Sequence, residues 1–215
     1  MSDVVNPDAA QRRPTRRDEQ ARQTRRAIVD AAHELFLADG FAATTMPGVA
    51  ARAGVAVQTV YKIFGSKPKL AKAVFDIAIA GDDDERPLIE RAALTRVRNE
   101  PDPLRMFQLY GEFLATVAPR HVPVQLVIRD AAASDAEAVA VWEELQQERL
   151  DGMTVFADNL QSRGVLRDDV SVDDARDTIW IYNSAEIYQL LVIARGWTPQ
   201  RYGRWVAEAL IAALL

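Results

Sequence analysis

Four polar side chains in one short segment have the chemistry of nucleic-acid recognition. They lie in VQTVYKIF, residues 57–64, and are Gln58, Thr59, Tyr61 and Lys62. Amide and hydroxyl groups can bond to base edges and phosphate oxygens, and a lysine adds a positive charge that attracts the DNA backbone. Val60 and Phe64 are spaced i and i+4, so on a helix they would face the core together. The four polar side chains would then point outward.

A tight turn and a preceding helix are needed to hold such a short helix in place. Gly54 tolerates the left-handed backbone of a tight turn, and Ala50 and Ala53 are small where two helices must cross closely. The order from Thr45 to Phe64 is therefore helix, turn, helix, an arrangement in which the second helix enters the major groove. A short helical hairpin with a solvated polar face is the alternative. The nearby basic residues and helix caps favour DNA binding.

The charge of the chain is divided between a basic N-terminal part and an acidic remainder. Residues 11–72 contain 12 Lys and Arg against 5 Asp and Glu, whereas residues 81–215 contain 14 against 23. This polarity indicates a small nucleic-acid-binding module on a body that does not bind DNA, although a solvated basic tail would give the same counts. An arginine arm precedes the module, and it either reaches phosphates or a minor groove or serves as a flexible tail. It contains Arg12, Arg13, Arg16 and Arg17.

Composition disfavours several other chemistries. The chain has no cysteine, so it has no disulfide framework and no thiolate zinc site, which fits a reducing compartment. Its two histidines, His33 and His121, are far apart in the sequence, and no metal-ligand spacing is present. The segment FGSK lacks the upstream glycine of a phosphate-binding loop, and no apolar run has the length of a membrane span. We therefore expect a cytoplasmic protein that is not an enzyme and uses no metal or cofactor.

Apolar residues recur at spacings of three and four along the whole chain, which predicts an all-α fold. Glycines, prolines and acidic breaks divide the chain into expected helices at about 19–38, 45–54, 57–64, 66–80, 87–99, 103–118, 121–133, 135–162, 172–195 and 199–214. We expect four parts: a disordered basic arm over residues 1–18, a three-helix helix-turn-helix DNA-binding domain over 19–65, a connecting helix over 66–80, and a larger helical-bundle domain for ligand binding and dimerisation over 81–215.

The segment GFAATTMPGVAARAGVAVQTVYKIFGSKPKL, residues 40–70, resembles the N-terminal signature of the tetracycline-repressor (TetR) family of transcriptional regulators. The shared pattern is a Gly-aromatic pair, Thr-Thr, an Ala-x-x-Ala-Gly-Val turn, Thr-x-Tyr, an aromatic residue, then Ser-Lys and Leu. The resemblance extends over about residues 20–80, and the rest of the chain is similar in length and helical layout. It implies a DNA-binding regulator with a small-molecule effector.

The resemblance also implies roles for single residues. Thr45, Tyr61 and Lys67 would contact the phosphate backbone. The positions above the base edges would be Val57, Gln58, Thr59 and Lys62. Two residues depart from the family pattern. Ala56 replaces a capping serine, which costs about 1 kcal/mol of helix stability, and Ile63 replaces a histidine or aromatic residue, so that it would pack or touch a thymine methyl.

A dimer is expected because one such module reads too few bases to be specific, whereas two modules read two half-sites. The last two expected helices carry apolar stripes that could pair across a two-fold axis as a four-helix bundle. The same stripes could also be intrachain core. The expected interface residues are Ile179, Tyr182, Ile187, Leu190, Leu191, Trp205, Val206, Ala209, Leu210 and Ala213.

The middle helices contain more aromatic and polar residues than simple packing needs, which indicates a mostly apolar ligand pocket between helices. Each residue alone is more typical of core than of a ligand contact. The candidates are Phe107, Tyr110, Phe113, His121, Arg129, Trp142, Met153, Phe156, Trp180 and Asn183. Residues 66–80 join this body to the DNA-binding module, so we expect that helix to transmit ligand binding.

The sequence therefore predicts a homodimeric repressor that binds a palindromic operator in double-stranded DNA and is released by a small, fairly apolar effector. Two alternatives remain open at this point. One is a ligand-independent DNA-binding protein with an architectural role. The other is a helical small-molecule-binding protein, or an enzyme, whose basic module is incidental.

Overall fold

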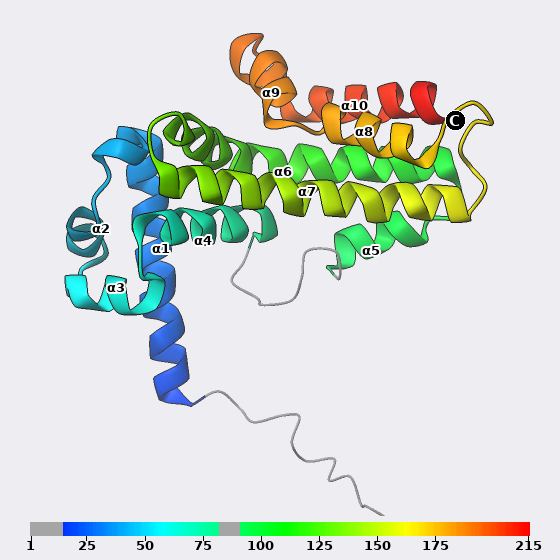
Figure 1. Ribbon diagram of the computed structural model, residues 1–215. Coiled ribbons are helices and arrows are strands. Elements are labelled where there is room, and N and C mark those ends of the chain that lie inside the picture. Colours follow the sequence, from blue (N-terminus) through cyan, green and yellow to red (C-terminus); the bar gives the residue numbers. More distant parts are fainter. Residues whose placement is uncertain (1–14, 82–90) are drawn as a thin grey trace, which may run out of the picture.

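The computed structural model describes residues 15–81 and 91–215, and within those ranges the chain forms helices and no strand (Figure 1). The elements are α1 (Arg16–Ala43), α2 (Met46–Ala53), α3 (Val57–Phe64), α4 (Lys67–Ala80), α5 (Ala92–Asn99), α6 (Pro103–Ala132), α7 (Ala136–Ser162), α8 (Val172–Tyr182), α9 (Ala185–Tyr188), the π-helix η3 (Gln189–Ala194) and α10 (Pro199–Leu214). The prediction of an all-α fold is confirmed. None of the helices in the described ranges has the length and apolarity needed to cross a membrane.

Two long helices, α6 and α7, run side by side through the molecule (Figure 1). Helices α8 and α10 cover one side of this pair, and α4 and α5 lie on the other side. Helices α1, α2 and α3 form a smaller unit at one end, which we call the head, and α5 to α10 form the body. Helix α4 leads from the head into the body.

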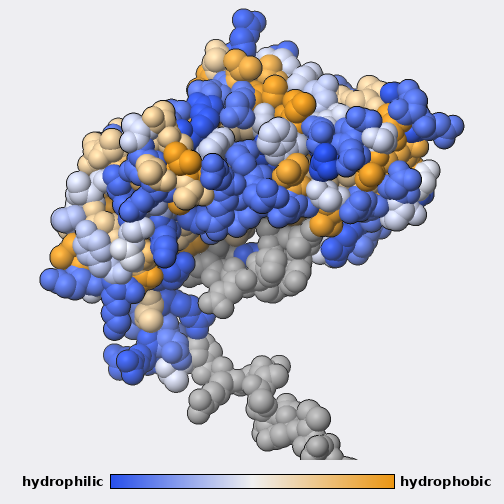
Figure 2. All heavy atoms as spheres, viewed as in Figure 1, coloured by the Kyte–Doolittle hydropathy of each residue, from blue (hydrophilic) through white to orange (hydrophobic). Residues whose placement is uncertain are grey.

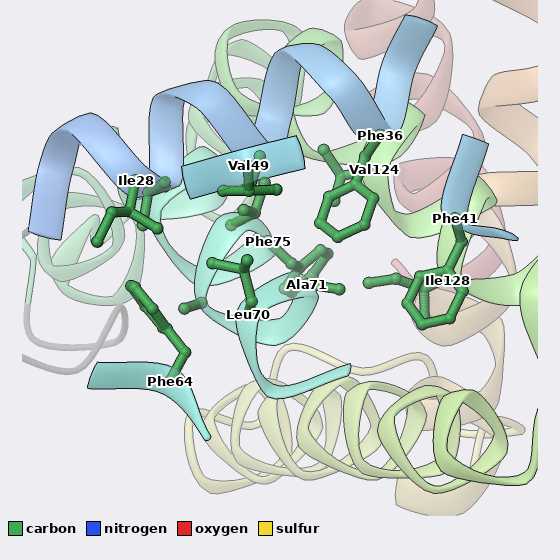
Figure 3. Close-up of a cluster of buried hydrophobic side chains, with 14 of the residues drawn as sticks. Ile28, Phe36, Phe41, Val49, Phe64, Leu70, Ala71, Phe75, Val124 and Ile128 are labelled. Carbon is green, nitrogen blue, oxygen red and sulfur yellow. The ribbon is translucent and has the colours of Figure 1, made fainter. Parts of the chain in front are cut away.

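One hydrophobic core joins the head to the body. Figure 3 shows Phe36 of α1, Val49 of α2 and Leu70 of α4 meeting in this core, and all three side chains are buried. Val124 and Ile128 of α6 enter the same core and are equally buried. Because their apolar surface is removed from water only while the head stays docked, the orientation of the head depends on α6.

Local capping signals place the short helices of the head as predicted. Thr45 caps α2, with its hydroxyl accepting a hydrogen bond of 3.1 Å from the backbone N–H of Gly48. Gly54 ends α2 in the left-handed conformation, with φ of 68°. Ser66 caps α4 through the backbone N–H of Lys69. These predictions of caps and turns are confirmed.

Helix α1 differs from its expected range at both ends. It begins at Arg16, because Thr15 and Asp18 form a capping box that satisfies free N–H groups of its first turn. The expectation of disorder up to residue 18 is therefore wrong for residues 16–18. Gly40 leaves the helical conformation with φ of 79°, as expected of a stop, but helical backbone resumes after it. Arg12 and Arg13 of the predicted arm lie outside the described residues.

Helix α6 is continuous where two helices were expected. The expected break at Pro119 does not occur, and both Pro119 and Pro123 lie inside the helix. A proline inside a helix removes one hydrogen bond and costs about 3 kcal/mol. The flanking residues Val117, Ala118 and Val122 are all buried, and the apolar area that they remove from water offsets this cost. The start of the helix expected at 87–99 lies outside the described residues, and α5 begins at Ala92.

The single helix expected over 172–195 is instead divided at residue 183. Helix α8 ends at Asn183, and Ser184 caps a new short helix by accepting a hydrogen bond of 3.3 Å from the backbone N–H of Ile187. The chain continues as the π-helix η3, a form that is rare and frequent at functional sites. The prediction failed because the division at Asn183 depends on side chains from α6 and α7.

Candidate functional site

Helix α3 presents a polar face to solvent and an apolar face to the head core. Val60 and Phe64 are 0% and 6% exposed, so they hold the helix against the core. Gln58, Tyr61 and Lys62 lie on the other face and are exposed. Their spacing of three and four residues places them on neighbouring turns of one helix face. This face has the width and chemistry to enter a major groove.

The remaining α3 positions lie at the edge of that face. Val57 and Ile63 are half-buried and pack against the head core, so only part of each side chain is available to a base. Thr59 is half-buried as well. Ala56 offers no side-chain cap to α3, so the prediction of an uncapped N-terminus is confirmed. The unsatisfied N–H groups at that end are donors for water or a phosphate.

The structure brings together the three residues to which the resemblance gave phosphate contacts. Thr45, Tyr61 and Lys67 line one open surface depression of about 560 Å³. The ammonium of Lys67 is partly engaged inside the protein, because it donates a hydrogen bond of 2.8 Å to the carbonyl oxygen of Phe41 and lies 4.1 Å from the centre of that ring. Two of its three N–H bonds remain for a phosphate.

Two carboxylates that the sequence gave no reason to place here line the same depression. Asp135 is the residue that caps the N-terminus of α7, and Glu137 lies in the first turn of that helix. Asp135 caps α7 by accepting hydrogen bonds from the backbone N–H groups of Glu137 and Ala138, at 2.9 and 3.1 Å. Glu137 is exposed. Their negative charge opposes that of a DNA phosphate at this edge of the head.

Five of the predicted pocket residues meet between α6, α7 and the end of α8, and we call them the aromatic cluster: Tyr110, Phe113, Met153, Phe156 and Asn183. The amide nitrogen of Asn183 donates to the hydroxyl of Tyr110 at 2.9 Å and contacts the sulfur of Met153 at 3.3 Å. The ring of Tyr110 lies 5.1 Å from that of Phe156 and 6.4 Å from that of Phe113. Burial raises the pKa of Tyr110 to about 12, so its hydroxyl stays protonated.

Other predicted pocket residues lie elsewhere. Phe107 is fully buried behind Phe156, with ring centres 5.8 Å apart. Trp142 packs against the core shared by the head and the body, which corrects its assignment to the pocket. Arg129 forms ion pairs with Asp130 and Glu186 at the surface. These two residues were predicted from residue type alone, and only the fold shows which side of α6 or α7 they occupy.

His121 connects the body to α4 rather than to the aromatic cluster. Its ring meets that of Phe75 edge to face, with centres 5.5 Å apart. Burial lowers the pKa of His121 to about 4, and Nδ1–H donates to the carbonyl oxygen of Val117 at 3.0 Å. The adjacent Arg120 donates a hydrogen bond of 3.0 Å to the carbonyl oxygen of Ala78, near the C-terminal end of α4. Helix α6 therefore holds the second half of α4.

Arg149 is the functional candidate that the sequence reasoning missed. Its guanidinium lies over the ring of Trp180, 4.4 Å from the ring centre, and donates to the Asn183 side chain at 2.8 Å. In the sequence it stands in the polar run EELQQERLDG, which is typical of a solvated helix face. Its spacing of four and seven residues from Met153 and Phe156 was the signal that could have placed it with the aromatic cluster.

The predicted dimer stripes divide into buried and exposed residues. Ile179, Val206 and Leu210 are 0% exposed within one chain, which corrects their assignment to an interface because they have no surface left for a partner. The half-buried residues are Tyr182, Ile187, Leu191, Trp205, Ala209 and Ala213. Leu190 is 60% exposed, and the unpredicted Ile181 and Ile193 are 53% and 55% exposed. Figure 2 shows apolar side chains gathered over the region of α9 and η3.

The head has the geometry of a helix-turn-helix DNA-binding protein. Gly54 makes the turn between α2 and α3, the polar face of α3 is exposed, and the shared hydrophobic core fixes the head against the body. Residues 28–74 match the family model described as "Bacterial regulatory proteins, tetR family". The head is therefore similar to the DNA-binding part of the tetR family of bacterial regulatory proteins.

Two curated relatives from Pseudomonas putida agree with this result. The chain is 25% identical to the "Probable HTH-type transcriptional regulator ArpR" and 24% identical to the "HTH-type transcriptional regulator TtgR". Each match extends over 186 residues, which are 83% of this chain and 85% of the relative.

Solved structures share the fold over nearly the whole chain. NalD, the secondary repressor of the MexAB-OprM multidrug efflux pump in Pseudomonas aeruginosa, has a TM-score of 0.70 at 19% identity, covering 92% of this chain and 98% of NalD. The transcriptional regulator FadR from Bacillus subtilis, in complex with stearoyl-CoA, has a TM-score of 0.69 at 20% identity, covering 88% of this chain and 99% of FadR.

Proposed function

We propose that the chain is a homodimeric repressor that binds a palindromic operator and is released by a small, fairly apolar effector. The observation that carries this proposal is the exposed face of α3, which presents Gln58, Tyr61 and Lys62 to solvent. On the opposite face Val60 is fully buried and fixes the helix against the core. In this proposal the base edges are contacted by Val57, Gln58, Thr59 and Lys62, and phosphates by Thr45, Tyr61 and Lys67. The protein would act in the cytoplasm, where its DNA lies.

The test of DNA recognition is a selection of fragments from the parent genome on the full-length protein. We expect an inverted repeat whose half-site centres are about one helical turn, or a multiple of it, apart. We also expect affinity to fall steeply with salt, because phosphate contacts release counterions. A selection that enriches no inverted repeat would exclude the operator-binding repressor.

The proposed dimer pairs the C-terminal helices of two chains. Ile181, Leu190 and Ile193 are large apolar side chains more than half exposed on the last helices, and exposed apolar side chains are common at an interface. Pairing across a two-fold axis would set the separation of the two α3 helices. Sedimentation should give a dimer at micromolar concentration, and the double change Leu190→Arg and Ile193→Arg should give a folded monomer. A monomeric wild-type protein would contradict the proposal.

Effector release would be transmitted through α4, which both long helices of the body hold. Arg120 of α6 binds the C-terminal end of α4, and Lys72 of α4 forms an ion pair of 3.1 Å with Glu148 of α7. A ligand that separates α6 from α7 at the aromatic cluster would therefore tilt α4 and the head. In support, NalD is a repressor and FadR was solved with stearoyl-CoA. The effector of this chain would be found by screening ligands for release of operator DNA.

A further inference from the structure

Arg149 of α7 is a cation that lies against the ring of Trp180, and within the described residues it donates no hydrogen bond to a carboxylate. Its hydrogen bonds go to neutral groups: the carbonyl oxygen of Trp180, the amide oxygen of Asn183 and the amide oxygen of Gln146. The carboxylate of Glu186 favours its charge through space without an ion pair. No ion pair of Arg149 occurs in the described part of the chain. Burial lowers the pKa of Arg149 to about 10, so it remains charged at neutral pH.

The hydrogen bonds of Arg149 leave part of its guanidinium unused. A guanidinium has five N–H donors, and the three neutral acceptors use two donors of Nη1 and one of Nη2. Nε is buried and has no partner within the described residues, and neither has the indole nitrogen of Trp180. Nε and Nη2 share the edge of the guanidinium that pairs side-on with a carboxylate.

Capping of α8 does not account for this arrangement. The bond to the carbonyl oxygen of Trp180 satisfies the end of α8, and positive charge at a helix C-terminus is favourable. That role needs neither a second acceptor at Asn183 nor a buried N–H without a partner, and leaving such a donor unpaired is costly. Unsatisfied buried donors on a cation are typical of a site for an anion.

The surroundings of Arg149 can accommodate an apolar ligand body. Met153 fills the gap between Tyr110 and Asn183, and a methionine side chain is flexible enough to move aside. The ring of Phe156 lines the next turn of the same helix face.

We propose that Arg149 is the anion-binding residue of the effector site and that the effector is an amphipathic organic anion. Its carboxylate, or an equivalent oxyanion, accepts hydrogen bonds from Nε and Nη2 of Arg149, and its apolar or aromatic body lies against Tyr110 and Phe156. This inference rests on the effector pocket of the proposed function and specifies the chemistry that the pocket selects.

The same arginine links the anion to regulation. Arg149 holds the end of α8 through Trp180 and Asn183, and the chain continues through α9 (Figure 1). It then enters η3, where Leu190 is exposed. An anion that draws the guanidinium toward itself weakens this hold. The neighbouring Glu148 pairs with Lys72 of α4, so a shift of α7 at the anion also reaches the head.

The test compares acids with their neutral amides on the full-length protein. The probes are naphthalene-2-acetate with naphthalene-2-acetamide, and decanoate with decanamide, titrated by calorimetry. We expect at least one acid to bind about tenfold more tightly than its amide. In Arg149→Lys this preference should fall to about twofold or less, since a lysine lacks the planar fork.

A second variant removes the anion site without deleting the arginine. Asn183→Asp places a carboxylate beside the guanidinium, which keeps the end of α8 held while it neutralises the charge. We expect the preference for the acid over its amide to disappear. The matched control is Arg163→Lys, since Arg163 also donates to a backbone carbonyl, that of Pro101, and lies outside the aromatic cluster. It should keep the wild-type preference.

The outcomes separate this inference from the proposed function. Equal binding of acids and amides, or an acid preference that survives both variants, would overturn the anion site. If the acids and the amides then both bind more weakly to Phe156→Ala, the apolar effector pocket is still supported, although the anion site is not. If no acid binds at about 1 mM, the anion site is overturned. The proposed repressor fails separately, in the DNA selection.

Discussion

Gly111 of α6 and Gly203 of α10 cross backbone to backbone. A Cβ added to Gly203 would lie 2.2 Å from the carbonyl oxygen of Gly111, and one added to Gly111 would lie 2.3 Å from that of Gly203. Both glycines are buried in ordinary helical conformation, so it is the contact distance that excludes a side chain. This crossing brings α10 against the long helix that also enters the head core.

Gly203→Ala should therefore destabilise the protein by about 3 kcal/mol, since backbone atoms cannot give way as a flexible side chain can. Chemical denaturation monitored by circular dichroism measures the loss. Gly152→Ala is the matched control, because a Cβ there meets nothing within 4 Å, and it should stabilise the protein by about 0.5 to 1 kcal/mol through helix propensity. A Gly203→Ala protein as stable as the wild type would show that α6 and α10 can separate freely.

Gln58→Ala and Tyr61→Phe should affect DNA binding in different ways. Tyr61 is 49% exposed beside Thr45 and Lys67, so the loss of its hydroxyl should weaken binding to operator and random DNA alike, by about tenfold. Gln58→Ala should remove the preference for one particular base at one position of each half-site. Fluorescence anisotropy with operator variants distinguishes the two results. Equal losses on specific and random DNA for Gln58→Ala would contradict base readout.

Glu137→Gln should strengthen DNA binding. The exposed carboxylate lines the same depression as Thr45, Tyr61 and Lys67, where it repels a phosphate. We expect affinity to rise about two- to fivefold at low salt and less at high salt, because exposed charges are screened. Glu143→Gln, on the same helix but outside the depression, is the control. An unchanged affinity for Glu137→Gln would mean that DNA does not approach this edge of the head.

His121 should make the fold sensitive to acid. Burial lowers its pKa from 6.5 to about 4, so between these values the unfolded chain binds more protons than the folded chain. Stability is therefore full above about pH 6.5 and declines as the pH falls toward 4, by on the order of 3 kcal/mol at most. Thermal melts between pH 4 and 7 measure this slope. His121→Leu should reduce it.

Some elements could be predicted to the residue, because their signals are local. Helix α3 spans Val57–Phe64 as expected, since Gly54 and Gly65 flank it and Val60 and Phe64 give its apolar period. The division at Asn183 could not be predicted in this way. It depends on Tyr110, 73 residues earlier, and on Arg149, 34 residues earlier. The local signals there, Asn183 at a helix end and the capping Ser184, are weak because both residue types also occur inside helices.

The sequence by itself determined the helical class, the caps and turns of the head, and the polar face of α3, because spacing and capping act over a few residues. Only the tertiary structure decided which residues of each apolar or polar stripe are buried in the core. Ile179 is fully buried while Leu190 is exposed, and Arg149 lies among aromatic rings although its neighbours in the sequence are polar. The physical reason is that burial depends on contacts between helices far apart in the chain, and these contacts have no local signal.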